Sequence, residues 1–141
     1  MLSLRYHNLK KIIVCGSIAN KGISKIRRIQ SLLKEKGFHV IDQISDEDYS
    51  KIKDFRGNKS LAEEITKHDL NFIKESDLVV ALLDRPSYGV AVEIYFAKMM
   101  GKKVIIMSKR KVPSPWPVAL SDRIINNEEQ LVSALRELGD E

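Results

Sequence analysis

The sequence predicts an α/β protein built on a doubly wound parallel sheet, and two features of the chain support this fold class. Short apolar runs rich in β-branched residues alternate with stretches of helical periodicity, which is the pattern of βα units. Within the apolar runs there is no alternation with polar residues, so each strand should be buried on both faces. Five such units predict a five-stranded sheet of flavodoxin-like or Rossmann-like topology, in the order 2-1-3-4-5.

Each expected strand is a short apolar run that ends at a glycine, a charged residue or a turn. The strands cover residues 11–15, 38–41, 77–83, 102–107 and 123–125. The first run stops at Gly16, and the third leads into a turn over residues 84–89. Because a ligand binds beyond the carboxyl ends of strands 1 and 3 in this topology, we expect the functional residues in these two turns.

Four helices are expected between and after the strands, each with an apolar face. They cover residues 22–36, 60–75, 89–100 and 128–138. Gly37 is the expected stop of the first helix, and Ser60 is the expected N-cap of the second, with Glu63 completing a capping box. The polar residues 45–59 should be irregular and form a candidate lid, and three prolines should keep residues 111–117 irregular.

Length and composition limit the classes of function. At 141 residues the chain should form one domain, 1–141, with residues 1–9 as a flexible arm. Its one cysteine, Cys15, is expected to be a small core residue, and with three scattered histidines it gives no metal-ligand spacing. No apolar run approaches the ~18 residues of a membrane span, and no signal peptide is evident, so we expect a cytoplasmic protein without metal or cofactor.

Positive charge is concentrated in two segments. The net charge is +5, yet residues 1–36 carry nine Lys or Arg against one acid, and residues 98–111 carry six and no acid. Two interpretations remain open, a solvated basic surface or a field that attracts a phosphate-bearing ligand. Only one aromatic residue, Phe96, lies near the second segment and no reader motif is present, so polynucleotide binding is not expected.

Two acidic residues occupy positions where apolar residues are expected. Asp69 falls on the apolar stripe of its helix, four residues after Ile65 and three before Phe72. Glu93 lies inside an apolar run near the start of the next helix. Each has a structural interpretation, Asp69 as a buried group bonded to backbone or lysine and Glu93 as a complement to the helix dipole. His68 is expected at the surface, because adjacent positions of a helix point apart.

A pair of carboxylates at the ligand edge of a sheet also suits cleavage of a glycosidic bond. One carboxylate must be ionised to attack or shield the anomeric carbon, and the other must be protonated to assist the leaving group. We expect Glu93 in the first role, because the positive end of a helix favours an ionised carboxylate. We expect Asp69 in the second role, because apolar neighbours favour its protonated form.

Several residues of the two turns are candidates for binding an anion. The backbone N–H groups of Gly16, Ser17 and Ile18 and the Ser17 hydroxyl should point into the crevice. Ser87 would either bind an anion or cap the following helix, and Lys21 would either reach a phosphate or remain an exposed lysine. The glycines lack the GxGxxG spacing and no Walker A lysine is present, so dinucleotides and nucleoside triphosphates are not expected.

Four segments together resemble the nucleoside 2-deoxyribosyltransferase family, and most closely its branch of 2′-deoxynucleoside 5′-phosphate N-hydrolases. They are Val-Cys-Gly-Ser-Ile at 14–18, His-Asp-Leu at 68–70, Ser-Asp-Leu-Val-Val-Ala at 76–81 and Pro-Ser-Tyr-Gly-Val-Ala-Val-Glu at 86–93, and the resemblance covers residues 11–108. It implies that Glu93 is the nucleophile of a glycosyl-enzyme and that Asp69 protonates the departing base. The residues that would hold the sugar and 5′-phosphate are Gly16, Ser17, Ile18, Ser87 and Gly89.

The sequence departs from the family pattern at two positions. The family commonly has a tyrosine two residues before the cysteine of strand 1, where this chain has Ile13, and often an arginine after Gly-Ser-Ile, where it has Ala19. Tyr88 is one candidate to supply the missing hydroxyl.

The resemblance also implies an oligomer, since family members are dimers or larger. A serine after strand 4 can reach the neighbour's phosphate pocket in this family, and Ser114 is its best match here. The helix over residues 89–100 is apolar almost all round, so one of its faces should be buried against a second subunit. We therefore expect a homodimer with shared active sites, in which Trp116 anchors its loop across the interface.

The sequence thus predicts an enzyme that hydrolyses the N-glycosidic bond of 2′-deoxynucleoside 5′-monophosphates to a free base and deoxyribose 5-phosphate. Two alternatives remain open. One is a nucleoside 2-deoxyribosyltransferase, which passes the deoxyribosyl group to another base, and the other is a non-catalytic nucleotide sensor on the same scaffold. The expected partner is a small nucleotide, with neither a polynucleotide nor a membrane involved.

Overall fold

The computed structural model describes residues 10–19, 21–44 and 49–139, and it contains the predicted parallel sheet in the order β2-β1-β3-β4-β5. The strands are β1 (Lys11–Cys15), β2 (His39–Val40), β3 (Leu78–Leu82), β4 (Lys103–Met107) and β5 (Arg123–Ile125). The helices are α2 (Gly22–Glu35), α3 (Lys59–Glu75), α4 (Tyr88–Met99), α5 (Pro115–Leu120) and α6 (Glu128–Gly139). The expected arm over residues 1–9 and part of the candidate lid, residues 45–48, lie outside the described residues.

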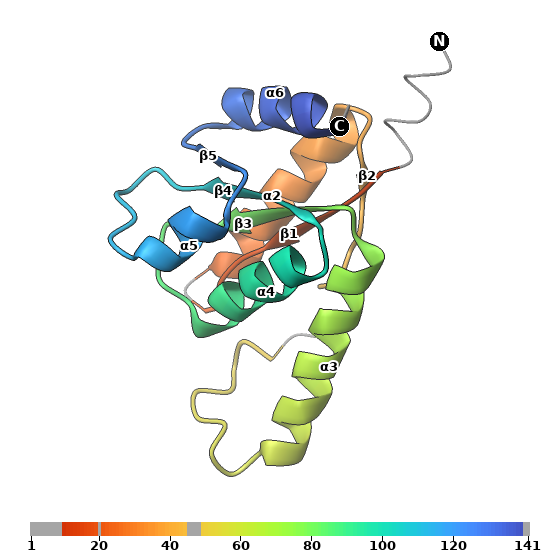
Figure 1. Ribbon diagram of the computed structural model, residues 1–141. Helices are drawn as coiled ribbons and strands as arrows, with labels where there is room; N and C mark the ends of the chain where they lie inside the picture. Colours follow the sequence, from red (N-terminus) through yellow and green to blue (C-terminus); the bar gives the residue numbers. More distant parts are fainter. Residues whose placement is uncertain (1–9, 20, 45–48, 140–141) are drawn as a thin grey trace.

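Helices cover both faces of the sheet, and this explains why the strands are apolar without alternation (Figure 1). On one face, Ile12 and Val14 of β1 pack with α2 and α6. On the other face, Ile13 and Cys15 pack with α3 and α4. All four side chains are buried, as the side-chain alternation along a strand between two helical layers requires.

Glycines end two of the helices through the same backbone arrangement. Gly37 follows α2 with φ +89°, and its N–H donates to Lys34 O while the next N–H donates to Leu33 O. Gly101 follows α4 with φ +76° and makes the equivalent pair of bonds. Positive φ is strained for residues with a Cβ, so glycine is the residue that allows these Schellman ends. The predicted stop at Gly37 is confirmed.

Two local predictions are wrong. α3 begins at Lys59, one residue before Ser60, and its N-cap Asn58 makes no side-chain cap bond, so Ser60 and Glu63 lie inside the helix and form no capping box. The proline segment is not irregular throughout, because α5 begins at Pro115 with Ser114 as its N-cap. Proline fits the first turn of a helix, where backbone N–H groups have no intrahelical partner.

The amino edge of the sheet is held by two aspartates that each precede a strand. Asp77 accepts the Lys11 N–H at 2.8 Å, and its own N–H donates to Lys11 O at 2.8 Å. Asp122 repeats this arrangement with Val104, at 2.8 Å in both directions, and adds an ion pair to Lys98 at 3.2 Å. These aspartates therefore link neighbouring strands β1 to β3 and β4 to β5.

The outermost strand beside β1 is β2, which is short. A side chain bonds to β1 at the point where the backbone pairing of β2 ends. The last backbone bond to β1 runs from the Ile41 N–H to Ile12 O, at 2.8 Å. Beyond it, Gln43 Nε2 donates to Val14 O at 2.6 Å, and Gln30 Nε2 donates to Gln43 Oε1 at 3.4 Å. The chain then leaves the sheet and returns along α3, whose first turns extend beyond the sheet beside residues 49–58 (Figure 1). No helix in the described ranges is long and apolar enough to cross a membrane.

Candidate active site

A pocket with a cavity volume of about 30 Å³ opens at the carboxyl end of β1, and both anomalous carboxylates line it. It brings together four predicted residues, Gly16, Ile18, Asp69 and Glu93. The other lining residues are Cys15, Ile26, Gln43, Ile44 and Tyr49.

Glu93 carries the clearest electrostatic anomaly of the pocket. Burial, and after it the negative charge of Asp69, raises the pKa of Glu93 to about 7. We expected Glu93 to be the readily ionised member of the pair, and this expectation is wrong for the free protein. The reason is that burial and the nearby charge of Asp69 oppose the ionised form, and these effects outweigh the hydrogen bond from Cys15.

Cys15 is buried as predicted, but it is also part of the site. Burial and the neighbouring carboxylates raise the pKa of the Cys15 thiol, so it stays protonated and acts as a donor. Its hydrogen bond to Glu93 lowers the pKa of that carboxyl, which partly opposes the effect of burial. The thiol therefore stabilises the ionised form of Glu93.

Asp69 is held by neighbours from two segments. Tyr49 Oη lies 3.4 Å from Asp69 Oδ2, and His68 Nδ1 lies 3.2 Å from Asp69 Oδ1. His68 is about one-fifth exposed and its ring packs edge-on against Phe72, with centroids 4.8 Å apart. The prediction that His68 lies at the surface, pointing away from Asp69, is therefore wrong.

A second pocket adjoins the first at Gly16 and contains Ser17. Its other lining residues are Ala19, Gly22, Lys25, Leu82, Asp84 and Arg85. Gly22 is required here, because a Cβ at this position would lie 1.5 Å from the Ser17 carbonyl oxygen. Lys21 is exposed, with φ +65° at the N-cap of α2, and is not among the residues that line either pocket.

Asp84 joins three elements around this second pocket. Its carboxylate pairs with Lys25 of α2 at 3.1 Å and accepts the Lys109 N–H, after β4, at 2.8 Å. Partial burial acts to raise the pKa of Asp84, but the Lys109 N–H and the Lys25 ammonium outweigh it and lower the pKa. Asp84 is thus an ionised link between the turns that follow β3 and β4.

The remaining predicted residues lie at helix starts. Ser87 caps α4, with its hydroxyl accepting the Val90 N–H at 3.3 Å, and a Cβ on Gly89 would lie 4.0 Å from Glu93 Oε1. Gly89 is therefore next to the carboxylate pocket. Ser114 caps α5 in the same way, accepting the Trp116 N–H at 3.4 Å, and it does not line the pocket of Glu93.

The sequence reasoning missed Gln43 and Tyr49. Both follow the expected second strand at the carboxyl edge of the sheet, which was the only available signal. Tyr88 is 97% exposed, so the candidate for the missing hydroxyl is not in the pocket, whereas the Tyr49 hydroxyl is. Among the residues that the structure describes, no group of three or more His, Cys, Asp or Glu side chains could hold a metal ion.

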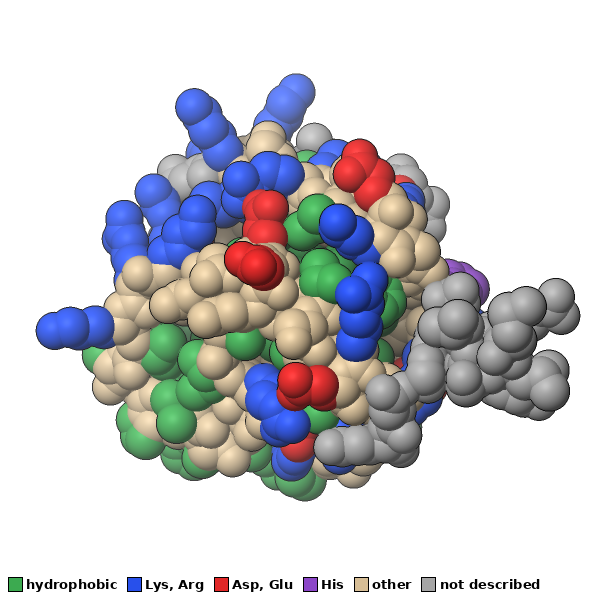
Figure 2. All heavy atoms as spheres, turned by 90° about the horizontal axis from the view of Figure 1, so that it is seen from above, with side chains coloured by type: hydrophobic (Ala, Val, Ile, Leu, Met, Phe, Trp, Pro, Cys, Tyr) green, Lys and Arg blue, Asp and Glu red, His purple; other side chains and the backbone are tan. Residues whose placement is uncertain are grey.

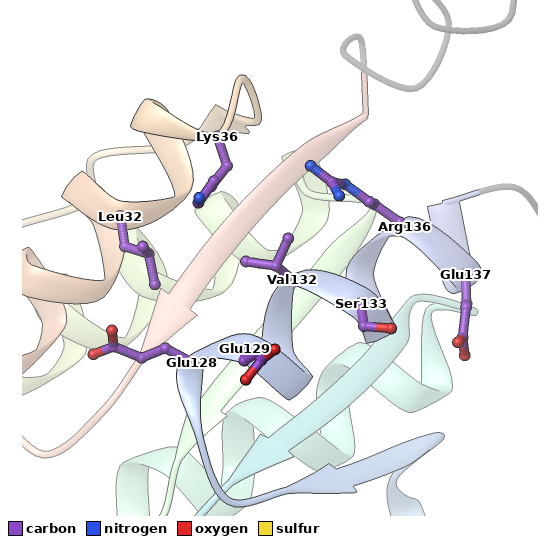
Figure 3. Close-up of a pocket in the computed structure, with 8 residues that line it drawn as sticks. All are labelled: Leu32, Lys36, Glu128, Glu129, Val132, Ser133, Arg136 and Glu137. Atoms are coloured by element: carbon purple, nitrogen blue, oxygen red, sulfur yellow. The ribbon is translucent and has the colours of Figure 1, made fainter.

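A groove on another face, between α2 and α6, does not share these features. Figure 3 shows Leu32 and Lys36 of α2 facing α6, with Glu128 and Glu129 at one end and Arg136 at the other. Its charged residues are of both signs, and neither Asp69 nor Glu93 lines it. The view from above shows basic side chains gathered at the upper left of the molecule (Figure 2).

A family model and one relative indicate the family of this chain. The model of the nucleoside 2-deoxyribosyltransferase family matches residues 13–135. A Thermofilum pendens protein named "Putative 2′-deoxynucleoside 5′-phosphate N-hydrolase 1" is 26% identical over 94 residues, and the match spans 63% of this chain but only 59% of that relative.

Solved structures give the same fold. A 2-deoxyribosyltransferase from the psychrotolerant bacterium Bacillus psychrosaccharolyticus superposes with a TM-score of 0.71 at 16% identity, covering 89% of this chain and 95% of that one. A CMP N-glycosidase from Clostridium botulinum superposes with a TM-score of 0.57 at 25% identity, covering 92% and 98%.

Proposed function

The chain belongs to the nucleoside 2-deoxyribosyltransferase family, and we propose that it hydrolyses the N-glycosidic bond of 2′-deoxynucleoside 5′-monophosphates. The products would be a free base and deoxyribose 5-phosphate. One observation carries the proposal: Asp69 and Glu93 line one pocket and interact electrostatically. Two carboxylates flanking an anomeric carbon are what glycosidic cleavage requires. The name of the Thermofilum pendens relative supports the monophosphate as the substrate class.

In the proposed reaction the Glu93 carboxylate attacks C1′ of the sugar. The bond from C1′ to the base breaks, its electron pair passes to the base nitrogen, and Asp69 gives that nitrogen a proton. Water then attacks C1′ of the glycosyl-enzyme and returns a proton to Asp69, which frees Glu93. One proton held by the carboxylate pair is sufficient for the cycle, because the proton lost to the base is regained from water.

We propose that the 5′-phosphate binds between the turn after β1 and the start of α4. Gly16, Ser17 and Ile18 form the turn, and Ser87 and Gly89 lie at the start of the helix that carries Glu93. Lys25, Arg85 and Asp84 line the adjoining pocket; Asp84 pairs with Lys25, so Arg85 supplies the positive charge that remains, while Lys21 would act only from the rim. Charge-assisted hydrogen bonds contribute about 1.5–3 kcal/mol each, so the phosphate should improve kcat/KM by about tenfold or more.

A homodimer with shared sites remains part of the proposal. Five exposed apolar side chains on α4 and α5 support a contact there: Val92, Tyr95, Met99, Trp116 and Val118, which are 45–70% exposed. A two-fold contact through this surface would bury them and bring Ser114, at the start of α5, to the partner's phosphate pocket. Sedimentation should then give a dimer. When Glu93→Ala and Ser114→Ala chains are co-refolded, half of the mixed sites carry neither lesion, so activity should exceed that of either parent.

The decisive assay is release of free base, followed by chromatography, from deoxynucleoside monophosphates, ribonucleoside monophosphates and unphosphorylated deoxynucleosides. We expect base release from the first class, abolished by Glu93→Ala. Exchange of the base with an added second base, with equal use of unphosphorylated nucleosides, would instead indicate the transferase. Binding of nucleotide without release of base, unchanged in Glu93→Gln, would indicate a sensor.

A second substrate class has one specific observation in its favour. The Clostridium botulinum neighbour is described as acting on CMP, a ribonucleotide, and it covers nearly the whole of this chain. The ribonucleotide arm of the assay therefore distinguishes the two sugars, and faster release from CMP than from its deoxy counterpart would favour this second class.

A further inference from the structure

Both carboxylate oxygens of Asp69 face a hydrogen-bonding side chain, and the two side chains come from different segments. His68 precedes Asp69 on α3, and its Nδ1 lies 3.2 Å from Oδ1. Tyr49 belongs to the segment between β2 and α3, and its hydroxyl lies 3.4 Å from Oδ2. An ionised carboxylate only accepts hydrogen bonds, so the phenol O–H is the donor in its pair, and the imidazole donates when Nδ1 carries its proton.

Each of these side chains is itself held by an aromatic neighbour. The Tyr49 ring packs edge-on against Phe55, with centroids 6.1 Å apart and an interplanar angle of 76°. The His68 ring packs edge-on against Phe72, at 4.8 Å and 73°. Aromatic pairs of this geometry add stability beyond the area they bury. The donors are therefore fixed in place on both sides of the carboxylate.

We propose that Tyr49 and His68 are positioning residues that fix the Asp69 carboxylate for proton transfer to the departing base. The inference rests on the proposed function, because it needs Asp69 to give up a proton as the bond between C1′ and the base breaks. When that proton passes to the base nitrogen, Asp69 is left as an anion, and the two donors stabilise it. A carboxylate that is fixed on both sides keeps its proton within reach of the base.

The first test removes one hydroxyl. Tyr49→Phe keeps the ring that packs on Phe55 and loses only the O–H. General acids contribute about 10²–10⁴-fold to catalysis, so partial misplacement of Asp69 should lower kcat by about tenfold, with KM for the monophosphate changed less than about threefold. Tyr88→Phe is the matched control, because Tyr88 is 97% exposed, and it should retain wild-type values of kcat and KM.

The second test asks whether the hydroxyl acts through Asp69. In an Asp69→Asn background the proton donor is already lost, so Tyr49→Phe should cause no further fall in kcat. An equal tenfold fall in both backgrounds would mean that Tyr49 supports the fold of the pocket instead, and would overturn the proposal. His68→Gln, which keeps an N–H donor, should retain more activity than His68→Leu.

The third test changes the leaving group. A deoxyribose 5-phosphate bearing 4-nitrophenol needs no proton on departure, so Tyr49→Phe should cleave it at the wild-type rate. A tenfold loss on this substrate would also overturn the inference. The two levels of failure are distinguishable: if the wild type releases no base from any substrate, the proposed function fails, whereas an active wild type with an equally active Tyr49→Phe contradicts only the inference.

Discussion

The two edges of the sheet hold carboxylates in opposite surroundings. At the amino edge, Asp122 accepts a backbone N–H and pairs with Lys98, and these donors lower its pKa against the effect of partial burial. At the carboxyl edge, burial and the charge of Asp69 raise the pKa of Glu93 to about 7. The hydrogen-bond donor that opposes this shift is the weakly polar thiol of Cys15. The amino edge joins strands, whereas the carboxyl edge keeps a carboxyl group poised between its two protonation states near neutral pH.

This difference teaches how to separate structural from functional carboxylates in one fold. A carboxylate that stabilises the fold has donors that favour its charge, as Asp122 and Asp84 have. A buried carboxylate beside a second carboxylate, as Glu93 is beside Asp69, destabilises the folded state when it is ionised. Such a group is a candidate for a catalytic role. Substitutions at the two edges should therefore have opposite consequences for activity and for stability.

The largest expected difference between the edges is in turnover. Glu93→Gln removes the nucleophile with little change of shape, so kcat/KM for base release should fall by roughly 10³-fold or more. Asp122→Asn, at the other edge, should retain the wild-type kcat of the folded fraction. Initial rates of base release, divided by the concentration of folded protein, measure the kinetic constants of both variants. Near-normal turnover by Glu93→Gln would remove Glu93 from the mechanism.

The next effect is the pH dependence of activity. The proposed mechanism needs one proton on the pair of Glu93 and Asp69, and above pH 7 the pair loses it, so kcat/KM should be level just below pH 7 and fall about tenfold for each unit of pH above it, because the pKa of Glu93 is about 7. A rate profile between pH 5 and 8.5 measures this limb. Activity that stays level up to pH 8.5 would contradict the electrostatic coupling to Asp69.

The Glu93→Gln substitution should raise stability, although it lowers activity. Between its ordinary pKa of 4.5 and about 7, folded Glu93 holds a proton that the unfolded chain has lost, so the wild type loses stability as pH rises through this window. Glu93→Gln avoids that loss. At pH 8 its free energy of unfolding, measured with denaturant, should exceed that of the wild type by up to ~3 kcal/mol. The gain should vanish near pH 4.5. The exposed Glu64→Gln is the matched control, and a gain of equal size there would contradict the assignment.

The smallest effect is expected at the amino edge. Asp122→Ala removes the acceptor of the Val104 N–H and the partner of Lys98, and should lower the free energy of unfolding by about 1–3 kcal/mol at pH 7. Because the pKa of Asp122 is lowered, this stabilisation is present at neutral pH and is lost as pH falls through the folded value. Asp54→Ala, whose pair with Arg56 lies in solvent, should leave the unfolding midpoint unchanged. A pH-independent loss for Asp122→Ala would show that charge is not its source.

Periodicity was sufficient to predict the sheet and to single out the two carboxylates. The strands are apolar on both faces because helices cover both, and this pattern is visible without any tertiary information. Asp69 and Glu93 could be found because each interrupts an apolar stripe. The turn at Gly16 could be placed because β1 ends there.

What the sequence could not supply depends on how segments meet. Tyr49 and Gln43 lie in a polar stretch with no period, and their contacts with Asp69 and Val14 depend on the path the chain takes after β2. The protonation of Glu93 was mispredicted because it follows from burial and from the charge of Asp69, and both depend on how α3 and α4 pack against the sheet.

The amide of Gln43 has a consequence for redesign of this protein. It bonds to Val14 O where backbone pairing of the edge strand has already ended, so side-chain bonds from Gln43 and Gln30, rather than a ladder of main-chain bonds, hold the segment there. Loop insertions and substitutions are tolerated best where little of the backbone is committed to the sheet. The side of the pocket formed by Gln43 is thus the part that substitutions can change with the least loss of sheet pairing, while the part that carries Asp69 and Glu93 stays fixed by two packed helices.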